Sequence, residues 1–270
     1  MFLAHGPADG PAGHAEAALR AALCAAREGG GALPPDSPVT RDAVCGAVVD
    51  LWTAGRLLAV RGPESATARH VLPRILLEGT EGLAAVLGTR LHEQGDCAGE
   101  FNRHARALAE AARQAGDPRL AARVAEALSG VADGGDRLAR PLTGVRPAVL
   151  PAVLAPAVTE LEAERLALAA ACRTLADGGA VPPLADRYAL LTAAAACLDR
   201  WRHRRAGHGT LTGDRARLVG ALERIAARLG RPADPARAEH DWRPLVLAEA
   251  LGHRFPATPV LSAMGRRAAS

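Results

Sequence analysis

Few side chains in this 270-residue sequence have the types and spacing of a known reaction centre. The sequence contains no lysine, and its glycines form neither GxxxxGK[ST] nor GxGxxG, the loops that cradle phosphates and dinucleotides. The GxSxG turn that presents a nucleophilic serine is also missing. The absence of lysine and of these motifs excludes a P-loop, a lysine Schiff base and a lysine clamp for phosphate.

Histidine and cysteine are the remaining candidates for chemistry. The nine histidines form no HxxxH or HExxH pair, so no two of them share a helix face as metal ligands. The five cysteines have no CxxC spacing, and most lie in Ala- or Val-rich helical stretches, where a thiol behaves as a small apolar group. We therefore predict no metal site and reduced thiols in or near the core for Cys24, Cys45, Cys97, Cys172 and Cys197.

Charged residues are concentrated in two short runs. Residues 200–205 read RWRHRR, and Gly207 and His208 follow. This run could clamp the phosphate of a nucleotide-like anion. The simpler interpretation, which we favour, is that cations stabilise the negative end of a helix dipole. Glu160, Glu162 and Glu164 alternate along the chain, so they spread around a helix and predict a solvated face.

Composition indicates a helical protein and excludes some partners. Hydrophobic residues make up 49% of the chain and aromatic residues only 3%, with alanine dominant. The formal net charge is +4 and every basic side chain is Arg, but aromatic platforms for bases are nearly absent, which argues against nucleic acid. No run of 18 apolar residues and no signal peptide are visible. We expect a cytoplasmic protein that does not span a membrane.

Gly and Pro divide the sequence into segments whose apolar residues recur at steps of three and four. Start signals for helices occur at Asp36-Ser37-Pro38 and at Asp117-Pro118. Asp96 to Gly99 is predicted to be a turn. The predicted helices cover 14–28, a segment from Pro38 that ends at Pro63, about 64–92, a segment that follows Gly99 to about Ala115, one from Pro118, about 157–177, about 185–205, one after Thr212 and one near 239–252.

The fold class predicted from these segments is all-α, built from one or two helical bundles. Residues 14–130 are expected to form a bundle. Residues 131–156 are rich in Gly, Pro and isolated apolar residues, and they predict a linker or crossover. Residues 157–255 are expected to form a C-terminal helical extension.

Three segments carry a family resemblance. Residues 70–90 read HVLPRILLEGTEGLAAVLGTR, and residues 185–198 read ADRYALLTAAAACL. Upstream, Arg27-Glu28-Gly29-Gly30 is followed by Val39-Thr40-Arg41-Asp42. Together they resemble the C-terminal helical bundle of acyl-CoA dehydrogenases and its extension in the larger actinobacterial-type members.

The resemblance implies a flavin enzyme, in which a carboxylate removes the proton α to a thioester and FAD accepts the β hydride. It also implies that Gly88, Thr89 and Arg90 meet the FAD of a neighbouring subunit. Two departures stand out. No strand-rich segment replaces the family's β domain, and Gln114-Ala115-Gly116-Asp117 stands where the catalytic Glu is expected. Glu110, the nearest carboxylate, lies one turn early, so we assign no catalytic residue.

The resemblance thus implies an acyl-CoA dehydrogenase-like subunit that lacks its own β domain and catalytic Glu and is inactive alone. It would act in a flavin-dependent homo- or hetero-oligomer, with another acyl-CoA dehydrogenase-like chain sharing its FAD. The alternative is a non-catalytic helical scaffold or interaction protein. A flavin interface should keep Gly88 to Arg90 open, polar and positively charged, whereas a scaffold should pack this corner shut.

Overall fold

The computed structural model describes residues 10–28, 37–62, 65–88, 91, 96–132, 142, 154–174, 181–204, 212–231 and 241–251. These ranges contain helices and no strand, which confirms the predicted all-α class for the described part of the chain. The helices are α1 (Pro11–Glu28), α2 (Pro38–Arg61), α3 (Ala66–Leu87), α4 (Asp96–Ala115), α5 (Pro118–Ala132), α7 (Ala155–Thr174), α8 (Val181–Arg204), α9 (Thr212–Arg228) and α10 (Arg243–Leu251).

The predicted start signals cap their helices. The Ser37 hydroxyl accepts a hydrogen bond from the Thr40 amide at the start of α2, and the Asp117 carboxylate accepts one from the Arg119 amide, 2.9 Å away, at the start of α5. Two predicted boundaries were wrong. Asp96 to Gly99 is the first turn of α4 rather than a separate turn, and the third helix ends at Leu87 rather than near residue 92.

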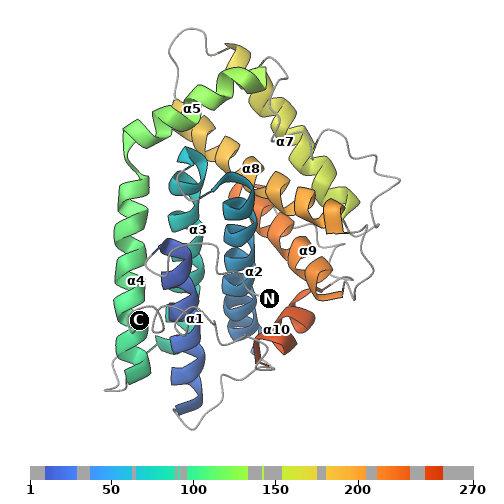
Figure 1. The fold of residues 1–270 in the computed structure, drawn as a ribbon. Helices are drawn as coiled ribbons and strands as arrows, with labels where there is room; N and C mark the ends of the chain where they lie inside the picture. Colours follow the sequence, from blue (N-terminus) through green and yellow to red (C-terminus); the bar gives the residue numbers. More distant parts are fainter. Residues whose placement is uncertain are drawn as a thin grey trace, which may run out of the picture.

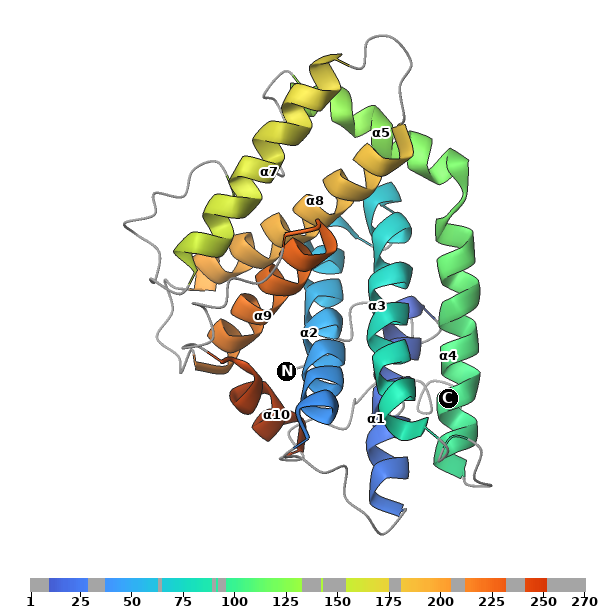
Figure 2. The same cartoon turned by 180° about the vertical axis from the view of Figure 1, so that it is seen from behind.

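The first four helices form a bundle. In Figures 1 and 2, α1, α2, α3 and α4 run side by side. Helices α1, α2 and α4 each pack against α3. The link Gly62 to Ser65 between α2 and α3 is short, so these two helices are antiparallel neighbours. The bundle therefore comprises α1 to α4.

The later helices cover the other side of α2. α8 and α9 cross it at a tilt, α10 packs near its N-terminal end, and α5 and α7 close over α8 (Figures 1 and 2). Buried residues of every helix join one hydrophobic cluster, to which Leu142 and Leu154, both 0% exposed, also belong. The chain between 131 and 156 therefore contributes to the core at these two positions.

α2 is the central helix of the molecule. All residues from Val44 to Leu57 are buried, whereas the sequence pattern predicted a single apolar stripe. The helix is long and apolar enough to cross a membrane by length and composition, with a mean hydropathy of 1.5 over its most apolar window. In the protein 72% of that window is buried, as expected for the core helix of a soluble protein, so this is weak evidence for a span.

Two predictions, one about the cysteines and one about Glu164, were wrong. Cys24 of α1 and Cys97 of α4 form a disulfide, because the two helices lie side by side and bring the Cα atoms within 6.0 Å. Cys45, Cys172 and Cys197 are free, as predicted.

Glu164 of α7 does not lie on the predicted solvated face. Its side chain is 2% exposed and pairs with Arg187 of α8 and with Arg231.

Candidate functional site

The corner implied by the resemblance begins where α3 ends. Gly88 has φ +53°, a left-handed conformation that favours glycine, and its amide donates to the Ala84 carbonyl to close the helix. The residue is exposed, and an added Cβ would meet nothing within 4 Å. Thr89 and Arg90 lie outside the described residues. The described part of this corner is therefore open.

Gly88 by itself offers a flavin room but no free hydrogen-bond donor. Its only backbone donor is already used within α3, and glycine has no side chain to add one. A flavin at this corner would therefore have to be held by Thr89, Arg90 and another chain. The described part of this corner does not hold a flavin on its own.

The end of α4 carries an amide at the position where the resemblance leads us to expect a catalytic Glu. Gln114 and Ala115 occupy its last positions, and the Gln114 amide donates to Glu110 Oε1 over 3.0 Å. Hydrogen bonds from Arg113 and Gln114 hold the pKa of the exposed Glu110 below its ordinary value. Glu110 is thus a weaker base than a free glutamate.

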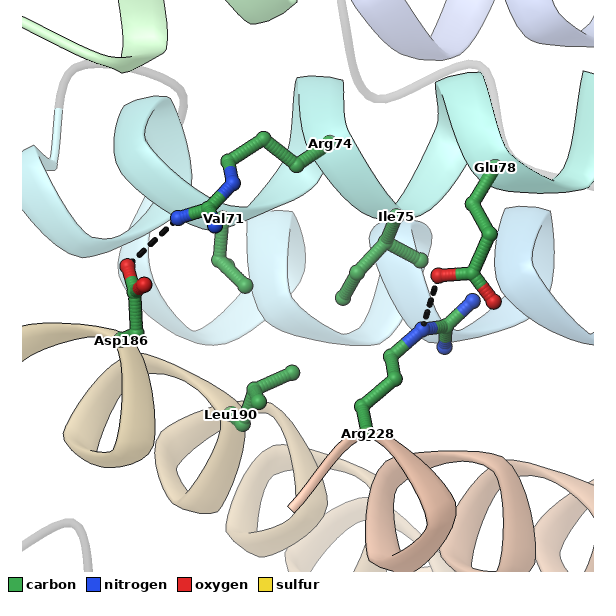
Figure 3. A pocket seen from close by; sticks show the side chains of 7 residues that line it. All are labelled: Val71, Arg74, Ile75, Glu78, Asp186, Leu190 and Arg228. Carbon is green, nitrogen blue, oxygen red and sulfur yellow. Dashed lines mark hydrogen bonds and ion pairs between the residues drawn. The ribbon is translucent and has the colours of Figure 1, made fainter. Parts of the chain in front are cut away.

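A cavity of about 240 Å³ lies between α3, α8 and α9. Figure 3 shows two charged pairs at its opposite ends, Arg74 with Asp186 and Glu78 with Arg228, and apolar side chains between them. The apolar residues are Val71, Ile75 and Leu190. Each charged pair joins α3 to a helix from the second half of the chain.

At the first end, Asp186 connects three helices. Its Oδ1 accepts from Arg74 Nη1 at 2.5 Å and from His70 Nε2 at 2.6 Å, and His70 Nδ1 lies 3.2 Å from the Ala115 carbonyl. Burial alone would raise the pKa of Asp186, but the bonds from Arg74 and His70 lower it below its ordinary value. Both ring nitrogens of His70 face acceptors, so only the doubly protonated ring donates to both.

At the second end, a buried carboxylate organises two arginines. Asp50 of α2 is 1% exposed and accepts four hydrogen bonds of 2.6–3.0 Å from Arg224 and Arg228 of α9. Arg228 Nε also donates to Glu78 Oε2 over 2.8 Å. Burial would lower the pKa of Arg228, but Asp50 and Glu78 together raise it above its ordinary value. This cluster of Asp50, Glu78, Arg224 and Arg228 has no net charge.

None of these cavity residues was predicted as functional from the sequence. Asp50 and Arg228 are 178 residues apart, so their pairing leaves no local spacing pattern. The available signal was a carboxylate inside a long apolar helix, where an unpaired charge is costly. On α3, Arg74 and Glu78 are one turn apart and could have been recognised as neighbours.

The other predicted candidates gain no site from the structure. The backbone of residues 200–204 forms the last turn of α8, as the helix-terminus interpretation expects, but the side chains of the basic run 200–208 lie outside the described residues. Among the described residues, no group of three or more His, Cys, Asp or Glu side chains could hold a metal ion.

Comparison with known proteins adds no relative. The sequence matches no protein-family model, and no curated protein and no solved structure matches it significantly. What can be said of function comes from the residues and the fold.

Proposed function

We propose that this chain is the helical subunit of an acyl-CoA dehydrogenase-like complex, in which a second chain supplies the β domain, most of the FAD site and the catalytic base. In this role the chain would close the partner's flavin site with the corner after α3 and would have no activity alone. The complex could be a hetero-oligomer or contain two copies of this chain.

The observation that carries the proposal is the open corner at Gly88, placed at the end of a bundle helix. The segment 70–90, which carries the resemblance, forms α3 and its terminus within the four-helix bundle α1–α4. An added Cβ at Gly88 would meet nothing within 4 Å, so a group from another chain has room to approach. Room for a second chain at Gly88 supports a flavin interface over a corner that is packed shut.

A non-catalytic scaffold is the second candidate. It is favoured by the buried acids, because Asp50 and Glu164 are both paired with arginines from other helices. Charges arranged in this way hold helices in register rather than perform chemistry.

Co-purification tests the first proposal. The chain is produced with acyl-CoA dehydrogenase-like chains encoded beside it, and the flavin absorption spectrum of the co-eluting complex is recorded. We expect a yellow complex, and we expect Arg90→Ala to weaken the association by removing a charge-assisted contact. The same variant should keep the free energy of unfolding within about 1 kcal/mol, as for an exposed side chain.

Arg69→Ala is the matched control, since Arg69 is an exposed arginine near the opposite end of α3. It should leave both flavin content and association unchanged. If Arg90→Ala leaves partner binding and flavin content unchanged, or clearly destabilises the chain, the flavin interface loses its support and the scaffold becomes the better candidate.

A further inference from the structure

The cavity between α3, α8 and α9 offers polar atoms that the protein itself does not use. Among the described residues, Asp186 Oδ2 has no hydrogen-bond partner, and Glu78 Oε1 has only Arg224 Nη2 at 3.7 Å. Arg74 donates to Asp186 through Nη1 alone. Donors of a guanidinium and acceptors of two carboxylates thus remain available at the cavity.

Arg74 and Glu78 are held apart although they are neighbours. They lie one turn apart on α3, a spacing at which opposite charges commonly pair. Each instead binds a partner on another helix: Arg74 binds Asp186 of α8, and Glu78 binds Arg228 of α9. The cross-helix partners therefore keep a positive and a negative group on opposite sides of the cavity, as Figure 3 shows.

The charged side chains at the two ends of the cavity differ in how exposed they are. At one end the Arg74 side chain is 48% exposed and Asp186 is 37% exposed. At the other end Glu78 is 55% exposed, whereas its partner Arg228 is only 12% exposed. Of the four charged groups in the two pairs, Arg74 at the first end is thus the more exposed cation, and Glu78 at the second end is the more exposed anion.

The space between the charges is apolar and small. Val71, Ile75 and Leu190 line it, and they are 4%, 2% and 9% exposed. The volume of about 240 Å³ lies below the roughly 300–1,000 Å³ of pockets for drug-sized ligands. A small metabolite with two opposite charges and an aliphatic part would match this lining.

We propose that this cavity binds a free α-amino acid with an aliphatic side chain. Its carboxylate would pair with Arg74, its ammonium group with Glu78, and its side chain would lie on Val71, Ile75 and Leu190. The site is separate from the Gly88 corner and does not depend on a partner chain or a flavin.

Methyl NMR on the unmodified chain tests the proposal with leucine as the probe. Titration should shift the methyl signals of Ile75 and Leu190 saturably and leave those of the exposed Leu166 and Leu245 unchanged. Leucinamide, which lacks the carboxylate, and 4-methylpentanoate, which lacks the ammonium group, should each bind at least about tenfold more weakly, because each loses one charge-assisted contact.

Two variants assign the charged contacts. Arg74→Gln and Glu78→Gln should each weaken leucine binding about tenfold. Arg69→Gln and Glu81→Gln are matched controls, since both residues are exposed on α3 and neither lines this cavity. The controls should bind leucine as the unmodified chain does, and circular dichroism shows which variants remain folded.

Three results would each overturn the proposal. The first is no saturable shift at Ile75 and Leu190 up to about 10 mM leucine, a rough ceiling for a specific small-molecule site. The second is equal binding of leucine and of either singly charged analogue. The third is unchanged binding by folded Arg74→Gln and Glu78→Gln. If those variants do not fold, the analogue series on the unmodified chain decides alone.

Discussion

Asp50 places a negative charge in the fully buried stretch of α2 between Val44 and Leu57. A carboxylate in such a position is tolerated only when its lone pairs are satisfied and its charge is compensated. Arg224 and Arg228 do both, because each guanidinium donates two hydrogen bonds to the carboxylate. The pair of arginines therefore depends on Asp50 as much as Asp50 depends on them.

We predict that Asp50→Asn lowers the free energy of unfolding by about 3–5 kcal/mol, because it leaves two partly buried guanidinium groups with the exposed Glu78 as their counter-charge. Urea unfolding followed by circular dichroism measures the loss. Glu78→Gln is the control, since the Glu78 side chain is 55% exposed and an exposed ion pair contributes no more than about 1 kcal/mol. Equal losses for the two variants would show that the buried network is not a distinct source of stability.

The cysteines differ sharply in their surroundings. Burial raises the pKa of the Cys45 and Cys197 thiols to about 12, and Cys172 is only partly buried. Cys24 and Cys97 are bonded to each other. A thiol reagent that needs the thiolate should therefore reach Cys172 far faster than the other four.

We predict that Ellman's reagent labels only Cys172 in the native, unreduced protein. Denaturation without reductant should expose the three free thiols, and reduction should release all five cysteines. Mass spectrometry of the labelled peptides identifies each site. Five reactive thiols in the denatured, unreduced protein would contradict the disulfide and restore the prediction made from the sequence.

Whether a contact between two residues could be predicted depends on how far apart they lie in the sequence. The caps Ser37 and Asp117 act on amides two or three residues away, and the sequence located both. The Cys24–Cys97 disulfide joins residues 73 apart, and the contacts of Arg224 with Asp50 join residues 174 apart. Such pairings depend on how whole helices pack, so no spacing rule could reveal them.

The packing of α9 against α10 depends on a glycine. A Cβ added at Gly220 would lie 2.8 Å from the ring carbon Cδ2 of Trp242, closer than any real contact. The indole is 5% exposed, and its Nε1 donates to Glu223 over 2.7 Å. Because the ring is held by this bond as well as by packing, it has little freedom to move away from α9.

We predict opposite effects for two Gly→Ala substitutions within helices. Gly220→Ala should destabilise the protein by about 1–3 kcal/mol through overpacking against Trp242. Gly99→Ala in α4 should stabilise it by about 0.5–1 kcal/mol, because an added Cβ meets nothing within 4 Å there and alanine favours helix. Thermal unfolding compares both variants with the unmodified chain. Stabilisation by Gly220→Ala would contradict the close contact.

Hydrophobic periodicity predicted where helices lie better than how they pack. On α3, Leu72, Ile75, Leu83 and Val86 share one predicted apolar face, and the first three are buried. Val86 is only partly buried, whereas its neighbour Leu87 is 3% exposed. In α8, apolar residues on neighbouring stripes are buried together, from Tyr188 to Leu198. A helix surrounded by others has no solvent face, and a single sequence does not reveal its number of neighbours.

The sequence pointed to the corner at Gly88 but not to the cavity between α3, α8 and α9. The resemblance located Gly88, and the structure adds that it is exposed and has room beside it. The cavity combines residues from positions 71 to 228, so only the folded arrangement brings them together. The predicted partner and cofactor concern groups outside this chain, and they remain proposals.

The last prediction concerns the chain as a unit: purified alone, with FAD added, it should not oxidise acyl thioesters. The reaction needs a base with high proton affinity beside the substrate. At the end of α4 stands Gln114, and the nearby Glu110 has a lowered pKa because Arg113 and Gln114 bind it. Nothing described at Gly88 adds a donor that would hold the flavin.

The assay follows acyl-CoA oxidation with an artificial electron acceptor, and the partner chain assayed alone and in complex serves as the positive control. Activity that stays with the isolated chain through successive purification steps, after other flavoproteins have been removed, would contradict the prediction. Such a result would require a base and a flavin site within this chain. Activity only in the complex would instead agree with a helical subunit that completes a site held by its partner.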